Sequence, residues 1–255
     1  MKNTVRRTIQ DRLSLDGKRA LVTGSSRGIG QAIAITLAEA GAEVVFHASS
    51  ASERLDKAVQ EAIDLGFKAK GVGADISSEE GVNALIESSG DIDILVLNAS
   101  AQVSSTVENF TIETFDREYR TNVLASCLLM RAFLPGMRDR QYGRIVTLGS
   151  VNEHRPSPDL CVYASTKAAQ HNILKGMVRP NAKFGITCNN LSPGVIETDR
   201  NKSFTEDPVE SPRVKNWIPA KRFGTPDDCS MIVLLLCSEA GSYITGADIL
   251  ISGGI

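Results

Sequence analysis

The amino-acid sequence predicts a three-layer α/β fold, in which one doubly wound parallel sheet of about seven strands carries helices on both faces. Short apolar runs alternate with longer helix-patterned segments from Lys18 to the C-terminus. This alternation indicates parallel strands joined by helical crossovers, and crossovers of that length are right-handed. No shift in composition marks a linker, and the chain shows no internal repeat. We therefore expect residues 1–255 to form a single domain.

The predicted strands are short apolar runs, as expected for strands buried within a sheet. In chain order they cover 20–22, 44–46, 94–97, 145–148, 186–191 and 249–251, with a weaker candidate around Val72. The helical patterns between them cover 28–40, 52–65, 79–87, 113–137, 163–183 and 226–238. Ser77 and Glu80 have the spacing of a capping box for the third of these helices.

The N-terminal segment is basic, with Lys2, Arg6, Arg7 and Arg12, and contains no apolar run. It therefore lacks the pattern of a secretory signal. We expect 1–14 to be a flexible N-terminal arm.

The segment 199–222 interrupts the strand–helix alternation. It is rich in charge, Pro and Ser, and it contains the only tryptophan, Trp217. Long loops inside compact domains are functional or disordered. Because this one follows a strand end at the ligand-binding edge of the sheet, we interpret it as a substrate-covering loop with a short helix. A plain surface loop is the alternative.

The overall composition argues against several classes of function. The formal net charge is -2, so neither nucleic acid nor an anionic membrane is an expected partner. The five cysteines form no CxxC pair, and their odd number disfavours a disulfide framework or a zinc site. Reduced thiols in a cytoplasmic protein are the simplest interpretation. No stretch approaches about 18 uninterrupted apolar residues, so we expect no membrane span.

A glycine-rich turn lies between the first predicted strand and the first predicted helix. Glycines there permit a tight turn and let the backbone approach a pyrophosphate, which then rests on the helix N-terminus. The turn occupies the correct place in a βαβ unit, so it predicts a Rossmann-like dinucleotide site, with a ligand-free connector as the alternative. The residues expected to contact the dinucleotide here are Gly24, Ser26, Arg27, Gly28, Ile29 and Gly30.

The end of the second predicted strand indicates which dinucleotide binds. An NAD site usually places an acidic residue there for the ribose 2′-hydroxyl. The segment 46–50 contains no carboxylate, and Ser49 and Ser50 could donate hydrogen bonds to a 2′-phosphate. Arg27 in the glycine turn could supply positive charge. We therefore favour NADP(H), and NAD(H) remains possible.

Ser150, Tyr163 and Lys167 form a candidate proton-transfer group. The last two are four residues apart, which places a phenol and an ammonium on one face of a helix. A nearby cation favours the phenolate, so we expect Lys167 to lower the pKa of Tyr163 toward neutrality. Ser150 could hold a substrate oxygen against the phenol. With a bound dinucleotide, these groups suit hydride transfer to or from a carbon that bears oxygen.

In its motifs and their order, the chain resembles the short-chain dehydrogenase/reductase family over residues 15–254. The matching motifs are the turn at 23–30, Asp75-Ile76, Asn98-Ala99, Asn122, Ser150, Tyr163 to Lys167, Ser192 to Thr198, and 244–246. The resemblance implies that Tyr163 is the general acid or base, that Lys167 lowers its pKa and binds the nicotinamide ribose, and that Ser150 polarises the substrate carbonyl. It implies that Asn122 holds a water linking Lys167 to solvent.

The resemblance also implies further cofactor contacts and an assembly. Asp75 and Ile76 would touch the adenine, and Asn98 and Ala99 would line the adenosine ribose. The nicotinamide end would meet a segment after the sixth strand, namely Pro193, Gly194, Ile196 and Thr198. The resemblance also implies that the protein assembles as a homotetramer.

The segment 151–162 should form a wall of the substrate pocket, and its polarity favours a sugar, polyol or other small hydroxy or keto compound. Glu153, His154 and Arg155 could instead be solvent-facing. No companion group at ligand spacing makes His154 a metal ligand, so we predict no metal site. His47 is interpreted as a strand-end residue and His171 as a helix-surface residue.

Two alternative functions stay open. One is a 3-oxoacyl-[acyl-carrier-protein] reductase, which requires a basic patch for an acidic carrier protein, with Arg131, Arg138 and Arg140 as candidates. The other is a dinucleotide-sensing protein without turnover. The complete set of proton-transfer residues argues against the second alternative.

Overall fold

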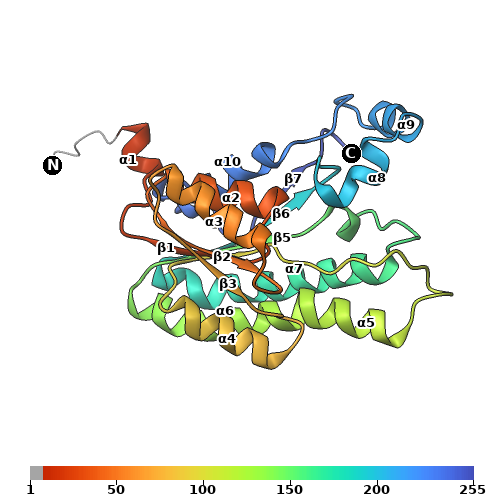
Figure 1. The fold of residues 1–255 in the computed structure, drawn as a ribbon. Coiled ribbons are helices and arrows are strands. Elements are labelled where there is room, and N and C mark those ends of the chain that lie inside the picture. The colour runs from red at the N-terminus through yellow and green to blue at the C-terminus, as the bar shows by residue number, and fades with distance from the viewer. Residues whose placement is uncertain (1–7) are drawn as a thin grey trace.

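The structure is a computed structural model and describes residues 8–255. Its centre is a seven-stranded parallel sheet with strand order β3-β2-β1-β4-β5-β6-β7, which confirms the predicted doubly wound fold (Figure 1). The strands are β1 (Arg19–Val22), β2 (Glu43–Ala48), β3 (Ala69–Gly73), β4 (Ile94–Leu97), β5 (Gly143–Leu148), β6 (Ile186–Pro193) and β7 (Asp248–Ile251). The weak candidate around Val72 is therefore a strand, β3.

Helices cover both faces of the sheet. One layer contains α2 (Gly28–Glu39), α3 (Glu53–Asp64) and α10 (Pro226–Cys237). The opposite layer contains α4 (Glu79–Ser89), α5 (Ile112–Tyr119), α6 (Ala125–Asp139) and α7 (Cys161–Asn181). Successive side chains of a strand point to opposite faces, so Ala20 and Val22 join the first apolar core while Leu21 joins the second. Both faces of the sheet are thereby buried.

Three local predictions need correction. Part of the predicted flexible arm is helical. Residues Ile9–Leu13 form α1, which begins with a capping box between Thr8 and Asp11. Residues 1–7 of the predicted arm lie outside the described residues. The predicted capping box at Ser77 is wrong, because the cap of α4 is Ser78, whose side chain accepts from the Gly81 N–H.

The predicted helix over 113–137 is divided by one π-helical turn, Arg120–Leu124, which joins α5 to α6.

The segment 199–222 is largely helical and not a plain loop. It contains a 3-10 turn (Asp199–Asn201), α8 (Lys202–Thr205) and α9 (Glu210–Trp217), and Figure 1 shows these helices projecting beyond the carboxyl ends of the strands. Among the described helices, none is long and apolar enough to cross a membrane.

Candidate active site

A cleft of about 1050 Å³ follows the carboxyl edge of the sheet. Parallel α/β sheets bind ligands at this edge, where the connections from adjacent strands diverge. The glycine turn after β1 and the loops after β4, β5 and β6 all contribute to its wall. Every residue predicted to bind the cofactor lines this one cleft, as do Ser150, Tyr163 and Lys167.

Helix α7 and the end of β5 position the proton-transfer group. Tyr163 and Lys167 lie on one face of α7, and both side chains are buried. Ser150 caps the 3-10 turn Val151–Glu153, and its hydroxyl accepts a hydrogen bond from the Asn152 N–H at 3.1 Å. The Ser150 hydroxyl also interacts with the phenol of Tyr163 and lowers its pKa. The three side chains that the sequence predicted to act together are thus brought together.

The electrostatics of Tyr163 differ from the prediction. Burial raises the pKa of its phenol, and the charge of Arg200 and the hydroxyl of Ser150 oppose that rise only in part. Burial and then the charge of Arg200 reduce the pKa of Lys167 itself to about 7. Desolvation disfavours both the phenolate and the ammonium, and it is the largest influence on each group. The cation that acts on the phenol is Arg200, a residue that the sequence did not single out.

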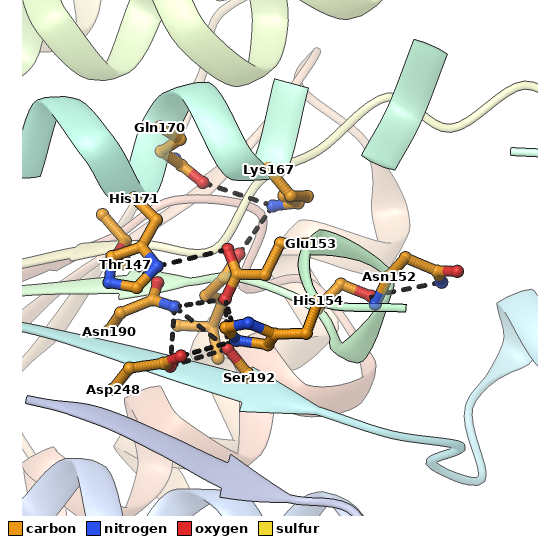
Figure 2. Close-up of polar contacts among 12 residues, drawn as sticks. Thr147, Asn152, Glu153, His154, Lys167, Gln170, His171, Asn190, Ser192 and Asp248 are labelled. Atoms are coloured by element: carbon orange, nitrogen blue, oxygen red, sulfur yellow. Dashed lines mark hydrogen bonds and ion pairs between the residues drawn. The ribbon is translucent and has the colours of Figure 1, made fainter. Parts of the chain in front are cut away.

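The ammonium of Lys167 is held by the backbone. Its Nζ donates to the Leu148 carbonyl at 2.6 Å and lies 3.5 Å from Oε1 of Gln170 (Figure 2). Nζ is 5.8 Å from the centroid of the Tyr163 ring. The carbonyl contact fixes the amine at the end of β5, where it faces the cleft.

Asn122 does not line the cleft. It lies in the π-helical turn, is fully buried, and donates through its amide to the Ala101 carbonyl at 2.8 Å and to Thr166 Oγ1 at 2.9 Å. Both amide hydrogens therefore have protein partners, and Ser126 Oγ donates to the Asn122 carbonyl. The side chain ties the loop after β4 to α7, and a role in holding water stays a prediction.

The glycine turn has the geometry of a phosphate site. Gly24 and Gly28 have φ values of 65° and 59°, which favour glycine, and a Cβ on Gly30 would lie 2.4 Å from the Gly24 carbonyl oxygen. No side chain caps the N-terminus of α2. Its first N–H groups are therefore available to an anion, and the backbone can approach closely. These observations fit a bound pyrophosphate.

His47 supports the same turn and is not merely a strand-end residue. Its side chain is buried, with Nδ1 accepting from the Gly24 N–H at 3.1 Å and Nε2 lying 2.9 Å from the Ala74 carbonyl oxygen. Burial lowers the pKa of its imidazole, which fits the neutral form that accepts and donates at once.

Ser49 and Ser50 line the end of the cleft next to the carboxyl end of β2, and their contact with the cofactor stays a prediction. Arg27 lines it too, but its guanidinium lies 3.4 Å from Asp199 and not at the serines. The sequence analysis missed Arg54, which lies in the first turn of α3 and also lines this end. The sequence could have indicated Arg54, because it lies in the first helical turn after the Ser52 cap, close to the end of the second strand.

A buried polar network lies behind the Ser150 turn (Figure 2). Glu153 is at its centre, with 1% of its side chain exposed, and it accepts hydrogen bonds from Asn190 and Ser192 on β6. Asp248 on β7 accepts a hydrogen bond from Asn190 at 2.9 Å, and its carboxylate oxygens lie 2.7 Å from Ser192 Oγ and 2.7 Å from His154 Nε2. The solvent-facing interpretation of Glu153 is therefore wrong. The network fastens the Ser150 turn to two strands.

Two histidine interpretations change as well. His171 faces inward, with Nδ1 at 3.7 Å from Glu153 Oε2, and is not a helix-surface residue. His154 does have companions, since it offers a ligand atom within 4.8 Å of those of Glu153 and Asp248. These atoms already hydrogen-bond within the network, and the arrangement does not by itself indicate a metal. The loop after β5 and strand β7 are far apart in the sequence, and only the tertiary structure brings them together.

Comparisons with known proteins agree with this geometry. A family model described as short chain dehydrogenase matches residues 18–209. The chain is 35% identical over 248 residues to a 3-oxoacyl-[acyl-carrier-protein] reductase of Vibrio cholerae, covering 95% of this chain and 99% of the relative. A solved 3-oxoacyl (acyl-carrier-protein) reductase from Agrobacterium tumefaciens C58 with NADP bound superposes with a TM-score of 0.94, at 35% identity and with 100% of both chains covered. A gluconate 5-dehydrogenase from Burkholderia cenocepacia in complex with NADP and tartrate has a TM-score of 0.90 and 33% identity, covering 97% of this chain and 98% of that chain.

Proposed function

Because the chain belongs to the short-chain dehydrogenase family, we propose that it is an NADP-dependent oxidoreductase that interconverts a carbonyl and a secondary alcohol. One observation carries this proposal: a single cleft joins a phosphate-type glycine turn to the Ser150, Tyr163 and Lys167 side chains. A dinucleotide that lies along this cleft would reach from the turn to the phenol.

The chain's own residues handle the proton and the substrate oxygen. Tyr163 donates its proton to the substrate oxygen during reduction, and Ser150 donates a second hydrogen bond to the same oxygen. Lys167, anchored on the Leu148 carbonyl, supports the developing phenolate. In the reverse direction Tyr163 acts as the base. The cofactor supplies or accepts the hydride.

NADP(H) is the proposed cofactor. Three features support a 2′-phosphate: Ser49 and Ser50 as donors, Arg54 as a cation at the same end of the cleft, and related structures that hold NADP. We expect NADPH to bind at least tenfold more tightly than NADH in a fluorescence titration, and Arg54→Gln to remove most of that preference. Equal affinities for both dinucleotides would contradict the assignment.

The proposed substrate is a small polar hydroxy or keto compound such as a sugar or polyol. The alternative, an acyl-carrier-protein thioester, is less well supported by the surface. Arg140 lies at 2.9 Å from Asp93, and Arg138 donates to Asn181 at 2.9 Å, which leaves the exposed Arg131 as the candidate guanidinium for an acidic partner.

An initial-rate screen tests these alternatives. NADPH oxidation is measured with ketosugars, keto acids and a 3-oxoacyl thioester, with Tyr163→Phe as the inactive control. Fast turnover of the thioester alone would favour the reductase alternative. A protein that binds NADPH but oxidises it with none of these carbonyls would support the dinucleotide-sensing alternative.

We further propose a cytoplasmic homotetramer. Large apolar side chains are exposed along α5 and at its end, and others lie on α10 and β7. They include Ile112, Phe115, Leu124, Met231 and Leu250. Two separate apolar regions are consistent with two subunit interfaces, the arrangement expected of a tetramer with dihedral symmetry.

A further inference from the structure

Arg200 bridges the two sides of the cleft near the catalytic phenol. It lies at the start of the 199–222 segment and reaches the loop after β4. There Nη2 donates to the Ser100 carbonyl at 3.0 Å, and Nη1 donates to Ser100 Oγ at 3.1 Å and lies 3.5 Å from Gln102 Oε1. Arg200 lines the same cleft as Tyr163 and Lys167. Its charge acts on both side chains, since it lowers the pKa of each.

The charge of Arg200 has no protein counter-ion among the described residues. All three of its acceptors are neutral oxygens, and no ion pair within 4.0 Å includes it. The neighbouring Asp199 is engaged elsewhere, at 3.4 Å from Arg27 and 3.3 Å from Lys202. Arg222, at the far end of the same segment, is paired with Asp228 at 2.7 Å. Arg200 thus differs from its neighbours in keeping an unneutralised guanidinium in the cleft.

A guanidinium held by neutral acceptors keeps its charge for a ligand. Its planar group of donors matches a carboxylate, and the two can form paired hydrogen bonds. The cofactor diphosphate is the other anion that could use this cation. However, the diphosphate already has the open N-terminus of α2. Arg200, in contrast, acts on Tyr163 and Lys167, which are the groups at the reacting end of the cleft.

We propose that Arg200 is the receptor for a carboxylate of the substrate, so that the enzyme acts on small hydroxy or keto acids in preference to neutral sugars. This inference rests on the proposed oxidoreductase function and names its substrate class. In this arrangement, binding of the carboxylate would displace the Ser100 and Gln102 oxygens or share the guanidinium with them. The bound acid would present its carbonyl to Tyr163.

Binding of tartrate tests the proposal without turnover. Titration calorimetry measures the affinity of tartrate, and of its uncharged analogue threitol, for the protein saturated with NADP⁺. We expect Arg200→Gln to weaken tartrate binding by roughly tenfold to a hundredfold, since a charged hydrogen bond is lost. Threitol should bind weakly and equally to all forms. Arg213→Gln is the matched control, because Arg213 is 79% exposed on α9 and outside the cleft.

Several results would overturn the proposal. Unchanged tartrate affinity in Arg200→Gln would do so, as would threitol binding as tightly as tartrate. A tenfold loss of NADP⁺ affinity in this variant would instead place the guanidinium on the cofactor phosphates. Failure of the proposed function is a separate result, in which the wild-type protein oxidises no NADPH with any carbonyl. Thermal melts of each variant confirm that it is folded.

Discussion

Burial is the main influence on the acidity of Tyr163 and Lys167. Both side chains lie beneath the cleft, and desolvation raises the pKa of the phenol while it lowers that of the amine to about 7. A phenol that stays protonated at neutral pH can donate a proton to the substrate oxygen during carbonyl reduction. Arg200 counteracts the effect of burial on the phenol, and an anionic substrate that neutralises Arg200 would strengthen the protonated form.

Tyr163→Phe tests the proton donor. The variant keeps the ring but loses the hydroxyl, so we expect turnover to fall by about 10² to 10⁴ while NADPH affinity changes little. Steady-state rates and a fluorescence titration measure the two quantities. Tyr119→Phe is the control, because the Tyr119 hydroxyl contacts Ser165 at 3.1 Å and lies outside the cleft. Full activity in Tyr163→Phe would refute the mechanism.

The pH dependence should follow the two buried groups. Lys167 loses its charge as pH rises through about 7, and the neutral amine stabilises a developing phenolate less well. We therefore expect kcat/KM for carbonyl reduction to fall as pH rises through about 7. Alcohol oxidation requires the phenolate and should rise toward alkaline pH, because burial raises the pKa of Tyr163. If Lys167→Met retains the inflection, another group is responsible for it.

At the scale of elements, two connections position the site. The Ser150 turn is fastened to β6 through Glu153 and to β7 through His154, and the glycine turn is packed against the end of β4. The Ser150 turn depends on the buried carboxyl group of Glu153. The glycine turn depends on residues that have no Cβ.

The pH dependence of stability tests the Glu153 network. Burial raises the pKa of Glu153, so the folded protein binds more protons than the unfolded chain just above pH 4.5. Its contribution to stability is complete below that pH and is lost as pH rises through the folded-state pKa. Glu153→Gln should remove this decline in denaturant unfolding measured across pH.

Asp248→Asn is the control of opposite sign. The hydrogen bonds of Asp248 outweigh the cost of its burial, and its pKa is lowered from 3.8. Its contribution to stability is therefore present above pH 3.8 and is lost as pH falls through the folded-state pKa. If both variants change the pH profile in the same direction, the electrostatic account of the network fails.

Gly30→Ala tests the glycine turn. The added Cβ would lie 2.4 Å from both Asn98 Nδ2 and the Gly24 carbonyl oxygen, and such overpacking costs roughly 1–3 kcal/mol. We expect the displaced turn to weaken NADPH binding by about tenfold or more. Gly176→Ala is the matched control, because Gly176 lies within α7 and, apart from the backbone of its own helix and its chain neighbours, no atom lies within 4 Å of its Cβ position. That substitution should leave affinity unchanged and stabilise the helix slightly.

At the scale of the whole molecule, the exposed apolar residues of α5 allow a test of the proposed tetramer. Ile112 is 78% exposed at the first position of α5, where a carboxylate is favourable for the helix. Ile112→Glu should therefore leave the fold intact but weaken association. Light scattering after gel filtration should give about four times 27.4 kDa for the wild type and a smaller mass for the variant. Ile9→Glu, on α1, is the control at a similarly exposed position.

The sequence by itself determined the alternation of strands and helices, the glycine turn, and the grouping of Ser150, Tyr163 and Lys167. Each depends on local spacing or on apolar periodicity, which the chain carries without reference to distant segments. The third strand gave only a weak pattern, because every residue of β3 stays partly exposed.

Only the tertiary structure decided what depends on segments far apart in the chain. It brings Asp248 to His154, faces Arg200 toward Ser100, and turns His171 inward. It also decides that burial outweighs the neighbouring cation at Tyr163. Desolvation and ion pairing depend on which groups surround a side chain in space, and the spacing of residues along the chain does not contain that information.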